Sequence, residues 1–466
     1  MSKLEFSKDF HWGVSTSAFQ IEGAYDKDGK GPSIWDEFTK KKKTILDNHH
    51  AQIACDFYHK YEEDISLIND LGIPNFRFSI SWTRIFPEGY GRVNQKGVDY
   101  YNRIIDRCIE QGIEPWVTLY HWDLPDNIEK RGGWTNRRIV DWFYDFAAFC
   151  ASHFGDRVKR WMVLNEPMVF TGAGYFLGIH APGKRGLKNF IPAVHHAVLC
   201  QAEGGRIIKE LRPDNLVGTT FSCSLIEPFR TNHPKDFKAA KRVDALTNRL
   251  FIEPALGMGY PTEDLPFLNR VEKHMRKGDE KRMQFDFDFI GIQNYTRELI
   301  KHSAFTPYLR AKLIESKKRN VPVTEMGWEV YPKSLAAMAK KFAAYKGVKE
   351  VIITENGAAF NDQVQNGEIY DKCRVDYIAQ NLKYLNKASF KTDKIGGYFV
   401  WSLLDNFEWA EGYHPRFGLI HVDYKTLERT PKYSALWYKK TIEKHLANFD
   451  GDLPIERDSV ILESRK

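Results

Sequence analysis

Several features that mark common classes of protein are missing from this sequence of 466 residues. No apolar run is long enough to span a membrane, and residues 1–10 contain no apolar stretch typical of a signal peptide. We therefore expect a soluble protein of the cytoplasm without a membrane partner. The sequon Asn294-Tyr295-Thr296 would carry no glycan in that compartment.

Cysteine is scarce, and its spacing argues against two kinds of site. The six cysteines are scattered along the chain without a CxxC pair. In a chain of this length, the pattern indicates reduced and mostly buried thiols instead of a disulfide framework. The His-His pairs at 49–50 and 195–196 lack metal-ligand spacing, and no HExxH motif occurs. We expect neither a metal nor an organic cofactor.

Charge of one sign is not in large excess. The chain has 68 Lys and Arg against 61 Asp and Glu, and the two signs are interspersed apart from Lys40-Lys41-Lys42-Lys43. Such a run is typical of a solvated loop. The glycines at 172 and 174 lack the spacing of a dinucleotide-binding loop. We therefore expect no nucleic-acid partner.

Eight β-prone apolar runs alternate with segments of helical spacing, a pattern that predicts an α/β fold closing into a (β/α)8 TIM barrel. No linker or repeat indicates a second domain, so we expect one domain over 1–466, with its core at about 10–445 and a charged tail at about 446–466, either disordered or packed on a neighbour. The predicted strands are 10–20, 75–82, 114–122, 161–166, 216–222, 288–296, 351–355 and 397–406. The predicted helices are 58–71, 97–111, 136–154, 191–211, 236–250, 334–345, 374–387 and 434–445.

Two glutamates share one sequence context. Glu166 and Glu355 each follow an apolar run and precede a turn signal, which is Pro167 or Asn356-Gly357. Each glutamate is therefore expected at the carboxyl end of a strand, where active groups of (β/α)8 barrels gather. Two carboxyl groups facing one substrate are the minimum for glycoside hydrolysis, at about 5–5.5 Å for retention or about 6.5–9.5 Å for inversion.

Other polar residues fall near the same rim. Arg77 is placed to pair with Glu355 and keep it charged, and Asn165 to donate to a sugar hydroxyl. Plainer alternatives stay open: glutamates capped at the surface, a structural ion pair for Arg77, and a buried core histidine at His121. The connection 297–331 is too long for a bare turn and is expected to help form the site.

Five motifs, in order, resemble those of glycoside hydrolase family 1, the β-glucosidase family. The resemblance covers residue 10 to about residue 438. It implies a retaining enzyme that hydrolyses terminal β-D-glucosides or oligosaccharides by double displacement, and that also accepts β-galactosides and β-fucosides. It leaves the oligomeric state open. The motifs are FHWGVSTSAFQIEGA (10–24), TLYHWDLP (118–125), LNEP (164–167), ITENG (353–357) and WSLLDNFEWAEGYHPRFGLIHVD (401–423).

The resemblance also implies roles for individual residues. Glu166 would be the general acid/base, and Glu355 the nucleophile that accepts a hydrogen bond from Tyr295. Trp401 would stack under the sugar ring, and Trp328 would lie near the aglycone. The other residues expected to contact or support the substrate are Gln20, His121, Trp122, Asn165, Glu408, Trp409 and Phe417, with Arg77 behind them.

Two branches of the family are disfavoured by single residues. Phospho-β-glycosidases have serine, lysine and tyrosine where this chain has Glu408, Pro415 and Phe417, and a carboxylate would repel a phosphate dianion. Thioglucosidases have glutamine at the acid/base position, whereas Glu166 is intact. Gln293 departs from the asparagine that is frequent in the family, and we expect the difference to affect the aglycone side.

Two other functions are weighed against this hypothesis. A non-catalytic sugar-binding barrel would not need both glutamates and Arg77. An isomerase or aldolase acting on phosphorylated substrates would need a phosphate site after strands seven and eight. The block at 401–423 is acidic and aromatic instead.

Overall fold

The computed structural model describes residues 4–449, and within this range eight parallel strands close into a barrel. Their order around the barrel is β1-β13-β10-β7-β5-β4-β3-β2, and β1 closes the ring by pairing with both β13 and β2. The expected (β/α)8 fold is confirmed. The strands are β1 (His11–Ser15), β2 (Asn75–Ser79), β3 (Glu114–Tyr120), β4 (Arg160–Asn165), β5 (Leu216–Ser222), β7 (Phe289–Gln293), β10 (Val351–Asn356) and β13 (Ile395–Trp401).

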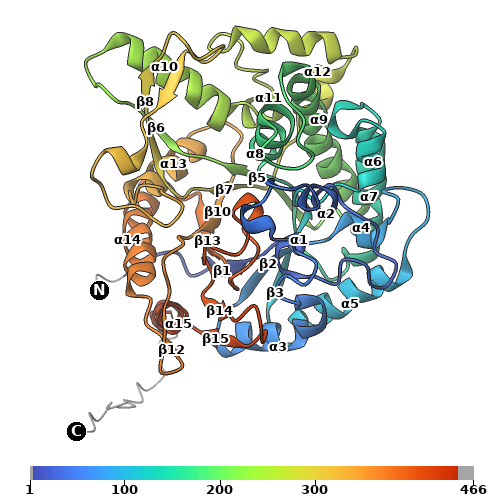
Figure 1. Ribbon diagram of the computed structural model, residues 1–466, viewed down its shortest axis with the longest axis vertical. Coiled ribbons are helices and arrows are strands. Elements are labelled where there is room, and N and C mark those ends of the chain that lie inside the picture. Colours follow the sequence, from blue (N-terminus) through green and yellow to red (C-terminus); the bar gives the residue numbers. More distant parts are fainter. Residues whose placement is uncertain (1–3, 450–466) are drawn as a thin grey trace.

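Amphipathic helices surround the strands (Figure 1). In α5, the buried residues include Val98, Tyr101, Ile104, Ile105 and Cys108, which recur at the helical spacing seen in the sequence. Each expected helix is present, with bounds that differ by a few residues. The longer helices are α3 (Phe57–Asp70), α5 (Gln95–Glu110), α7 (Ile139–Phe154), α9 (Leu187–Leu211), α10 (Pro234–Asp244), α13 (Lys333–Ala343), α14 (Lys372–Ser389) and α15 (Tyr433–Ala447).

Short elements fill the connections. The short α-helices are α1 (Ala18–Ile21), α2 (Ile34–Thr39), α4 (Trp82–Ile85), α6 (Asp126–Lys130), α8 (Pro167–Thr171), α11 (Ile252–Ala255) and α12 (Asp279–Arg282). Helices of other types are Leu46–Asn48, Gly133–Thr135, Gly172–Leu177, Ala245–Arg249, Pro266–His274, Ser316–Lys318 and Trp409–Glu411. The additional strands are β6 (Leu225–Pro228), β8 (Arg297–His302), β9 (Ala311–Leu313), β11 (Val364–Gln365), β12 (Glu368–Ile369), β14 (Ile420–Val422) and β15 (Arg429–Pro431).

Large side chains fill the inside of the barrel. Small residues on neighbouring strands make room for them: a Cβ on Gly13 would lie 2.4 Å from Phe399, and one on Gly218 would lie 2.4 Å from Phe289. The interior is thus a packed core. The interior cluster consists of Trp116, Met162, Phe289, Ile352 and Phe399.

The first predicted strand is too long. It ends at Ser15 instead of residue 20, and α1 follows after a short extended segment. The Ser79 hydroxyl at the end of β2 accepts a hydrogen bond from the Ala18 backbone N–H at 2.7 Å, which turns the chain out of the sheet. This turn carries Gln20 toward the loop that follows β13. The prediction of 397–406 is also too long, because β13 ends at Trp401.

The long connection after β7 is structured. β8 and β9 form a three-stranded sheet with β6, and α10 packs on this sheet through Ala239, Ala240 and Val243. The end of the connection brings Met326 and Trp328 to the cavity described below. The segment thus lines a cavity, as the expectation requires, and its part in a functional site stays a prediction.

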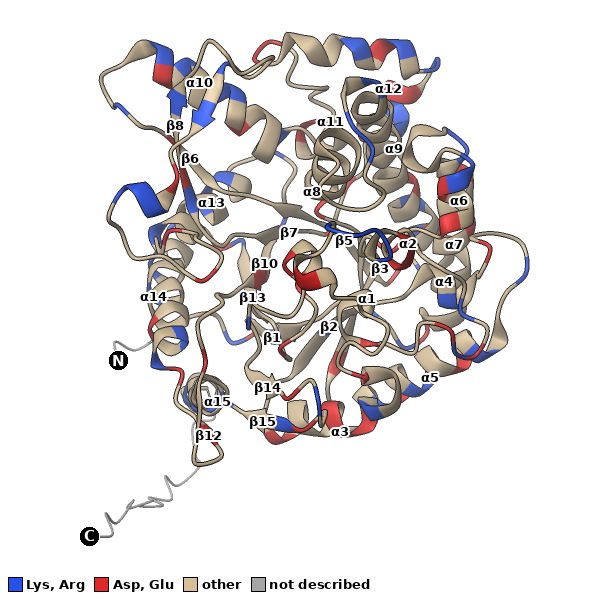
Figure 2. Ribbon diagram, in the orientation of Figure 1, with Lys and Arg blue, Asp and Glu red and all other residues tan. Residues whose placement is uncertain are grey.

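The remaining expectations concern thiols and charges. All six cysteines are unpaired, and five of them are buried. Lys40 to Lys43 form an exposed turn, and charges of both signs are interspersed over the outer elements (Figure 2). Among residues 4–449, no helix has both the length and the apolar character needed to cross a bilayer. Most of the predicted tail, residues 450–466, lies outside the described residues.

Candidate active site

A cavity of about 290 Å³ opens beyond the carboxyl ends of the barrel strands. Glu166 directly follows β4 and Glu355 lies in β10, and both line this cavity. The two distant halves of the chain therefore meet at one site, as the strand-end pattern predicts. Of the other expected residues, those that line the cavity are His121, Trp122, Tyr295, Trp328, Trp401, Glu408, Trp409 and Phe417.

The backbone of three residues in the cavity wall is strained. Trp122, Glu166 and Trp409 have φ angles of 79°, 45° and 48°, in the left-handed region that side chains disfavour. Such conformations cost of order 1–3 kcal/mol each and persist where the surroundings hold them. After Glu166, Pro167 starts α8 at once, which fixes the direction of the Glu166 side chain.

Glu355 is held by three hydrogen-bond donors. Arg77 Nη1 lies 2.5 Å from Glu355 Oε1, and the Tyr295 hydroxyl donates to Oε2 at 2.6 Å. Gln293 Nε2 also donates to Oε1, at 2.8 Å. The expected ion pair with Arg77 and the expected bond from Tyr295 are both present. All three contacts favour the charged carboxylate.

Asn165 lies behind the cavity at the centre of a buried hydrogen-bond network. Its Oδ1 accepts from Arg77 Nη2 at 2.5 Å and from Gln293 Nε2 at 2.7 Å, and its Nδ2 donates to His121 Nε2 at 3.0 Å. Asn165, Gln20 and Arg77 do not line the cavity themselves. These three residues thus lie behind the cavity wall near the ends of the strands, and the expected contacts of Gln20 and Asn165 with a sugar stay a prediction.

The expectation for Gln293 is wrong. We expected its extra length to matter on the aglycone side, but Gln293 is fully buried below the cavity and bonds Glu355 and Asn165. As the last residue of β7, its side chain points into the barrel, toward the end of β10. The residue thus bears on the environment of the Glu355 carboxylate.

Burial and charge separate the two glutamates. Burial, and next the negative charge of Glu355, raise the pKa of Glu166 well above its ordinary value. Burial also raises the pKa of Glu355, but the Arg77 charge and the Tyr295 hydroxyl work against that shift. Because Glu166 lacks a comparable cation, a proton shared by the pair rests on Glu166.

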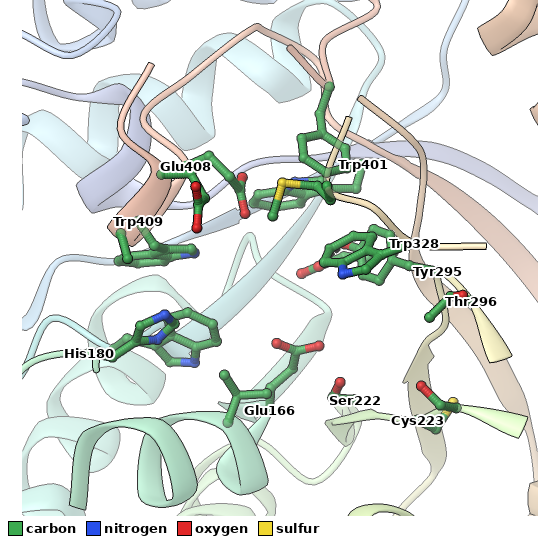
Figure 3. A pocket seen from close by; sticks show the side chains of 18 of the residues that line it. Glu166, His180, Ser222, Cys223, Tyr295, Thr296, Trp328, Trp401, Glu408 and Trp409 are labelled. Atoms are coloured by element: carbon green, nitrogen blue, oxygen red, sulfur yellow. Dashed lines mark hydrogen bonds between the residues drawn. The ribbon is translucent and has the colours of Figure 1, made fainter. Parts of the chain in front are cut away.

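Glu408 lies across the cavity from Glu166 (Figure 3). Burial, the Glu355 charge and the Glu411 charge raise the pKa of Glu408 to about 8. Gln20 Nε2 donates to Phe407 O at 2.9 Å and to Glu408 Oε2 at 3.5 Å, which orients the loop that carries Glu408.

Aromatic rings form two walls of the cavity. On one side, the ring centroids of Trp122 and Trp409 lie 4.4 Å apart, and those of His121 and Trp401 lie 5.9 Å apart. On the other side, the ring centroid of Tyr295 lies 5.2 Å from that of Trp328 and 6.2 Å from that of Phe417. Such flat apolar surfaces suit the C–H faces of a sugar ring.

Some residues of the cavity wall were not predicted. Ser222 lines the cavity and is the last residue of β5, so the strand-end argument applied to it as well. His180, Glu298 and Met326 lie outside the barrel strands, and no local pattern marks them.

One group within residues 4–449 has donors arranged as a metal could use them. Atoms of Asp47, His49 and His414 lie within 4.8 Å of one another, and none of the three lines the cavity. The spacing of His49 and His50 gave no sign of this group, because His414 comes from the other end of the chain. His414 Nε2 lies 2.8 Å from Asp47 Oδ2, and Asp47 and His414 are exposed.

Comparison with known proteins agrees with this geometry. The family model described as glycosyl hydrolase family 1 matches residues 2–447. The chain belongs to glycosyl hydrolase family 1. It is therefore a glycosidase, and the resemblance seen in the motifs is confirmed.

Members of family 1 differ in their substrates. β-Glucosidase A of Thermotoga maritima is 41% identical to this chain, over 96% of this chain and 99% of the relative. The solved structure of a family 1 β-glucosidase from that organism superposes with a TM-score of 0.92 at 40% identity, covering 95% of this chain and 99% of the other. A 6-phospho-β-galactosidase of Clostridium acetobutylicum is 34% identical, over 95% of this chain and 98% of the relative.

Proposed function

We propose that this protein is a retaining β-glucosidase that removes terminal β-D-glucosyl residues by double displacement. One observation carries the proposal: two buried carboxyl groups face one cavity, and only Glu355 is held by a cation, Arg77. Glu166 is the group that keeps a proton. This division supplies both an acid and a nucleophile. The identity to β-glucosidase A of Thermotoga maritima supports the same activity.

In the first step, a Glu355 oxygen attacks the anomeric carbon while Glu166 gives its proton to the glycosidic oxygen. The bond between that carbon and that oxygen breaks, the aglycone leaves as an alcohol, and a glycosyl ester on Glu355 remains. Glu166 is then ionised. Its raised pKa allows it to hold the proton near neutral pH until this transfer.

In the second step, water replaces the ester. Glu166, now a carboxylate, removes a proton from a water molecule whose oxygen attacks the anomeric carbon. The bond to Glu355 breaks, and the sugar leaves with its original β configuration after two inversions. Glu355 returns to its carboxylate form, which Arg77 and Tyr295 stabilise.

The polar groups around the glutamates suit a neutral sugar. His121 Nε2 faces the Asn165 amide N–H, so the imidazole proton lies on Nδ1, which has no partner among residues 4–449 and is free to donate to a hydroxyl. Burial holds the pKa of His121 well below its ordinary value, so the ring is neutral. Glu408 is placed to accept bonds from adjacent sugar hydroxyls, of either epimer at C4. We therefore include β-galactosides and β-fucosides as secondary substrates.

A 6-phosphorylated sugar is disfavoured. Glu408 and Glu411 both line the cavity, and neither Pro415 nor Phe417 offers a cation. A phosphate dianion needs cations or neutral donors at short range. The proposal therefore differs from the activity of the 6-phospho-β-galactosidase relative.

The decisive experiment uses p-nitrophenyl β-D-glucoside. The wild-type protein should release nitrophenol, and nuclear magnetic resonance should detect β-glucose as the first anomer. A Glu355→Gly variant should be inactive with an unchanged circular dichroism spectrum. α-Glucose as the first product would contradict retention. A wild-type protein that binds glucosides without releasing nitrophenol would be a sugar-binding barrel.

A further inference from the structure

A second cavity, of about 540 Å³, adjoins the first. It lies among α8 and the helix Gly172–Leu177, the start of α9, the helix Ala245–Arg249 and the loop at 306–309. Val169 and Ser222 line both cavities, so the two spaces border the same residues. We call the second space the side cavity.

The side cavity begins beside the acid. Ser222 and Glu166 line the same cavity, and the Val169 N–H donates to the Glu166 backbone oxygen at 2.9 Å, one helical turn later. In the proposed reaction, Glu166 protonates the oxygen that leaves with the aglycone. A substituent on that oxygen therefore starts next to Val169 and Ser222, at the entrance of the side cavity.

The walls of the side cavity are apolar. Within the described part of the chain no charged residue lines it, and its polar members are Ser222, Thr247, Thr306 and Tyr308. Two lining side chains, Leu177 and Tyr308, are 52% and 47% exposed. Concave apolar surface left open to water is typical of a binding site for an apolar ligand. The main apolar side chains of the wall are Met168, Phe176, Leu177, Phe190, Leu246 and Leu309.

The catalytic cavity itself offers a different kind of wall. On the side of Trp328 it is lined by Thr296 and Glu298, which are polar and suit the hydroxyls of a second sugar. A hydrocarbon chain that passed the Trp328 ring on that side would lie against these polar groups. The side cavity has the opposite chemistry, and its volume is within the range of about 300–1,000 Å³ that is usual for pockets of small ligands.

We propose that the side cavity binds apolar aglycones, so that β-D-glucosides of alkyl chains of about eight carbons are preferred substrates. This inference rests on the proposed β-glucosidase activity. Each methylene group moved from water into an apolar site contributes a factor of about four in affinity at most. Even partial burial of the five carbons that separate an octyl from a propyl chain gives a large preference.

The test compares octyl and propyl β-D-glucosides, each below its micelle-forming concentration. Both alcohols leave with similar ease, so the ratio of their kcat/KM values reports the contacts of the chain. We expect the octyl glucoside to be favoured by at least about tenfold, mainly through a lower KM. Equal kcat/KM values would overturn the proposal.

Two variants test the location. Leu177→Asp places a charge at the mouth of the side cavity, and Ala173→Phe fills part of it. Each should lower the octyl-to-propyl ratio of kcat/KM at least about fivefold. Leu313→Asp is the matched control, because Leu313 is 46% exposed and lies outside the cavity, on β9. It should keep the wild-type ratio.

The outcomes separate the two proposals. Failure of both alkyl glucosides and of p-nitrophenyl β-D-glucoside would reject the β-glucosidase activity itself. Activity on all three substrates without an octyl preference would reject only the proposal that the side cavity binds apolar aglycones. An octyl preference that neither Leu177→Asp nor Ala173→Phe reduces would show that the chain binds elsewhere, and would also reject it.

Discussion

Arg77 Nη1 lies 2.5 Å from Glu355 Oε1, and the Arg77 side chain has no exposed surface while that of Glu355 has 5%. Arg77 is in β2 and Glu355 in β10, and β1 and β13 lie between these two strands in the ring. A buried guanidinium is costly unless it is paired. The barrel therefore positions the proposed nucleophile and its cation together, and we expect the reactivity of Glu355 to depend on this contact.

Replacing Arg77 should change the pH dependence of the enzyme. In Arg77→Met, the loss of the cation raises the pKa of Glu355, and only the ionised carboxylate is nucleophilic. The acidic limb of kcat/KM should therefore move to higher pH by about 1–3 units. Thermal unfolding should show a loss of about 3–5 kcal/mol, because an unpaired charge stays buried.

Arg160→Met is the control for this shift. Arg160 pairs with Glu114 at the amino ends of their strands, away from the cavity. Its replacement should leave the acidic limb in place. An Arg77→Met enzyme with an unmoved acidic limb would show that Arg77 does not set the charge of Glu355.

The Tyr295 hydroxyl provides a second, weaker contact. Tyr295→Phe removes a hydrogen bond to a charged group, which is worth about 1.5–3 kcal/mol. Because the Tyr295 bond is made to the nucleophile, kcat should fall about ten- to hundredfold, measured with aryl β-D-glucosides. Tyr384→Phe on α14 should have no such effect. A decrease confined to KM would point to substrate contact instead.

The strand-end pattern explains how far the sequence predicted the site. Glu166, His121 and Glu355 follow apolar runs, and in a closed barrel the ends of all such runs meet at one rim. The end of an apolar run shows where a strand ends, even when its neighbouring strands are unknown. The same argument applies to Ser222, the last residue of β5, and would have identified it as a residue of the cavity wall.

Other parts depend on contacts between distant segments and could not be predicted. The prediction of one strand over 10–20 is wrong because the Ser79 hydroxyl, from the neighbouring strand, ends β1 early. Gln293 was placed on the wrong side because its partner, Asn165, is on another strand. The side cavity brings Leu246 and Leu309 together, from loops without any shared pattern.

Removal of the acid should be rescued chemically. Glu166→Ala cannot protonate a poor leaving group or activate water, so the glycosyl ester on Glu355 should accumulate with an activated aryl glucoside. Azide needs no base, so it should restore turnover and give a β-glycosyl azide, identified by nuclear magnetic resonance. An α-azide, or no rescue, would contradict the role of Glu166.

The same variant should lose one limb of the pH profile. Glu166 acts as an acid only below its raised pKa, so wild-type kcat/KM falls as pH rises through that value. For Glu166→Ala with an activated aryl glucoside, kcat/KM should stay constant over the same basic range. Persistence of the basic limb would assign it to another group.

Glu408 should link stability to pH. Burial raises its folded pKa to about 8 from an ordinary value of 4.5, so folding favours the protonated form. Between pH 4.5 and 8, Glu408 is ionised in the unfolded chain but still protonated in the folded protein. The free energy of unfolding therefore declines as pH rises through this range. Glu408→Gln mimics the neutral acid, and its melting temperature relative to wild type should increase across this window.

Activity should move in the opposite direction. A glutamine at 408 cannot become the carboxylate that accepts from two sugar hydroxyls, whereas Glu408 ionises as the pH approaches 8, so kcat/KM for β-D-glucosides should fall about tenfold or more near pH 8. Glu443→Gln on α15 serves as the control for both measurements. A melting temperature difference that stays constant from pH 4.5 to 8 would show that the burial of Glu408 does not set its protonation.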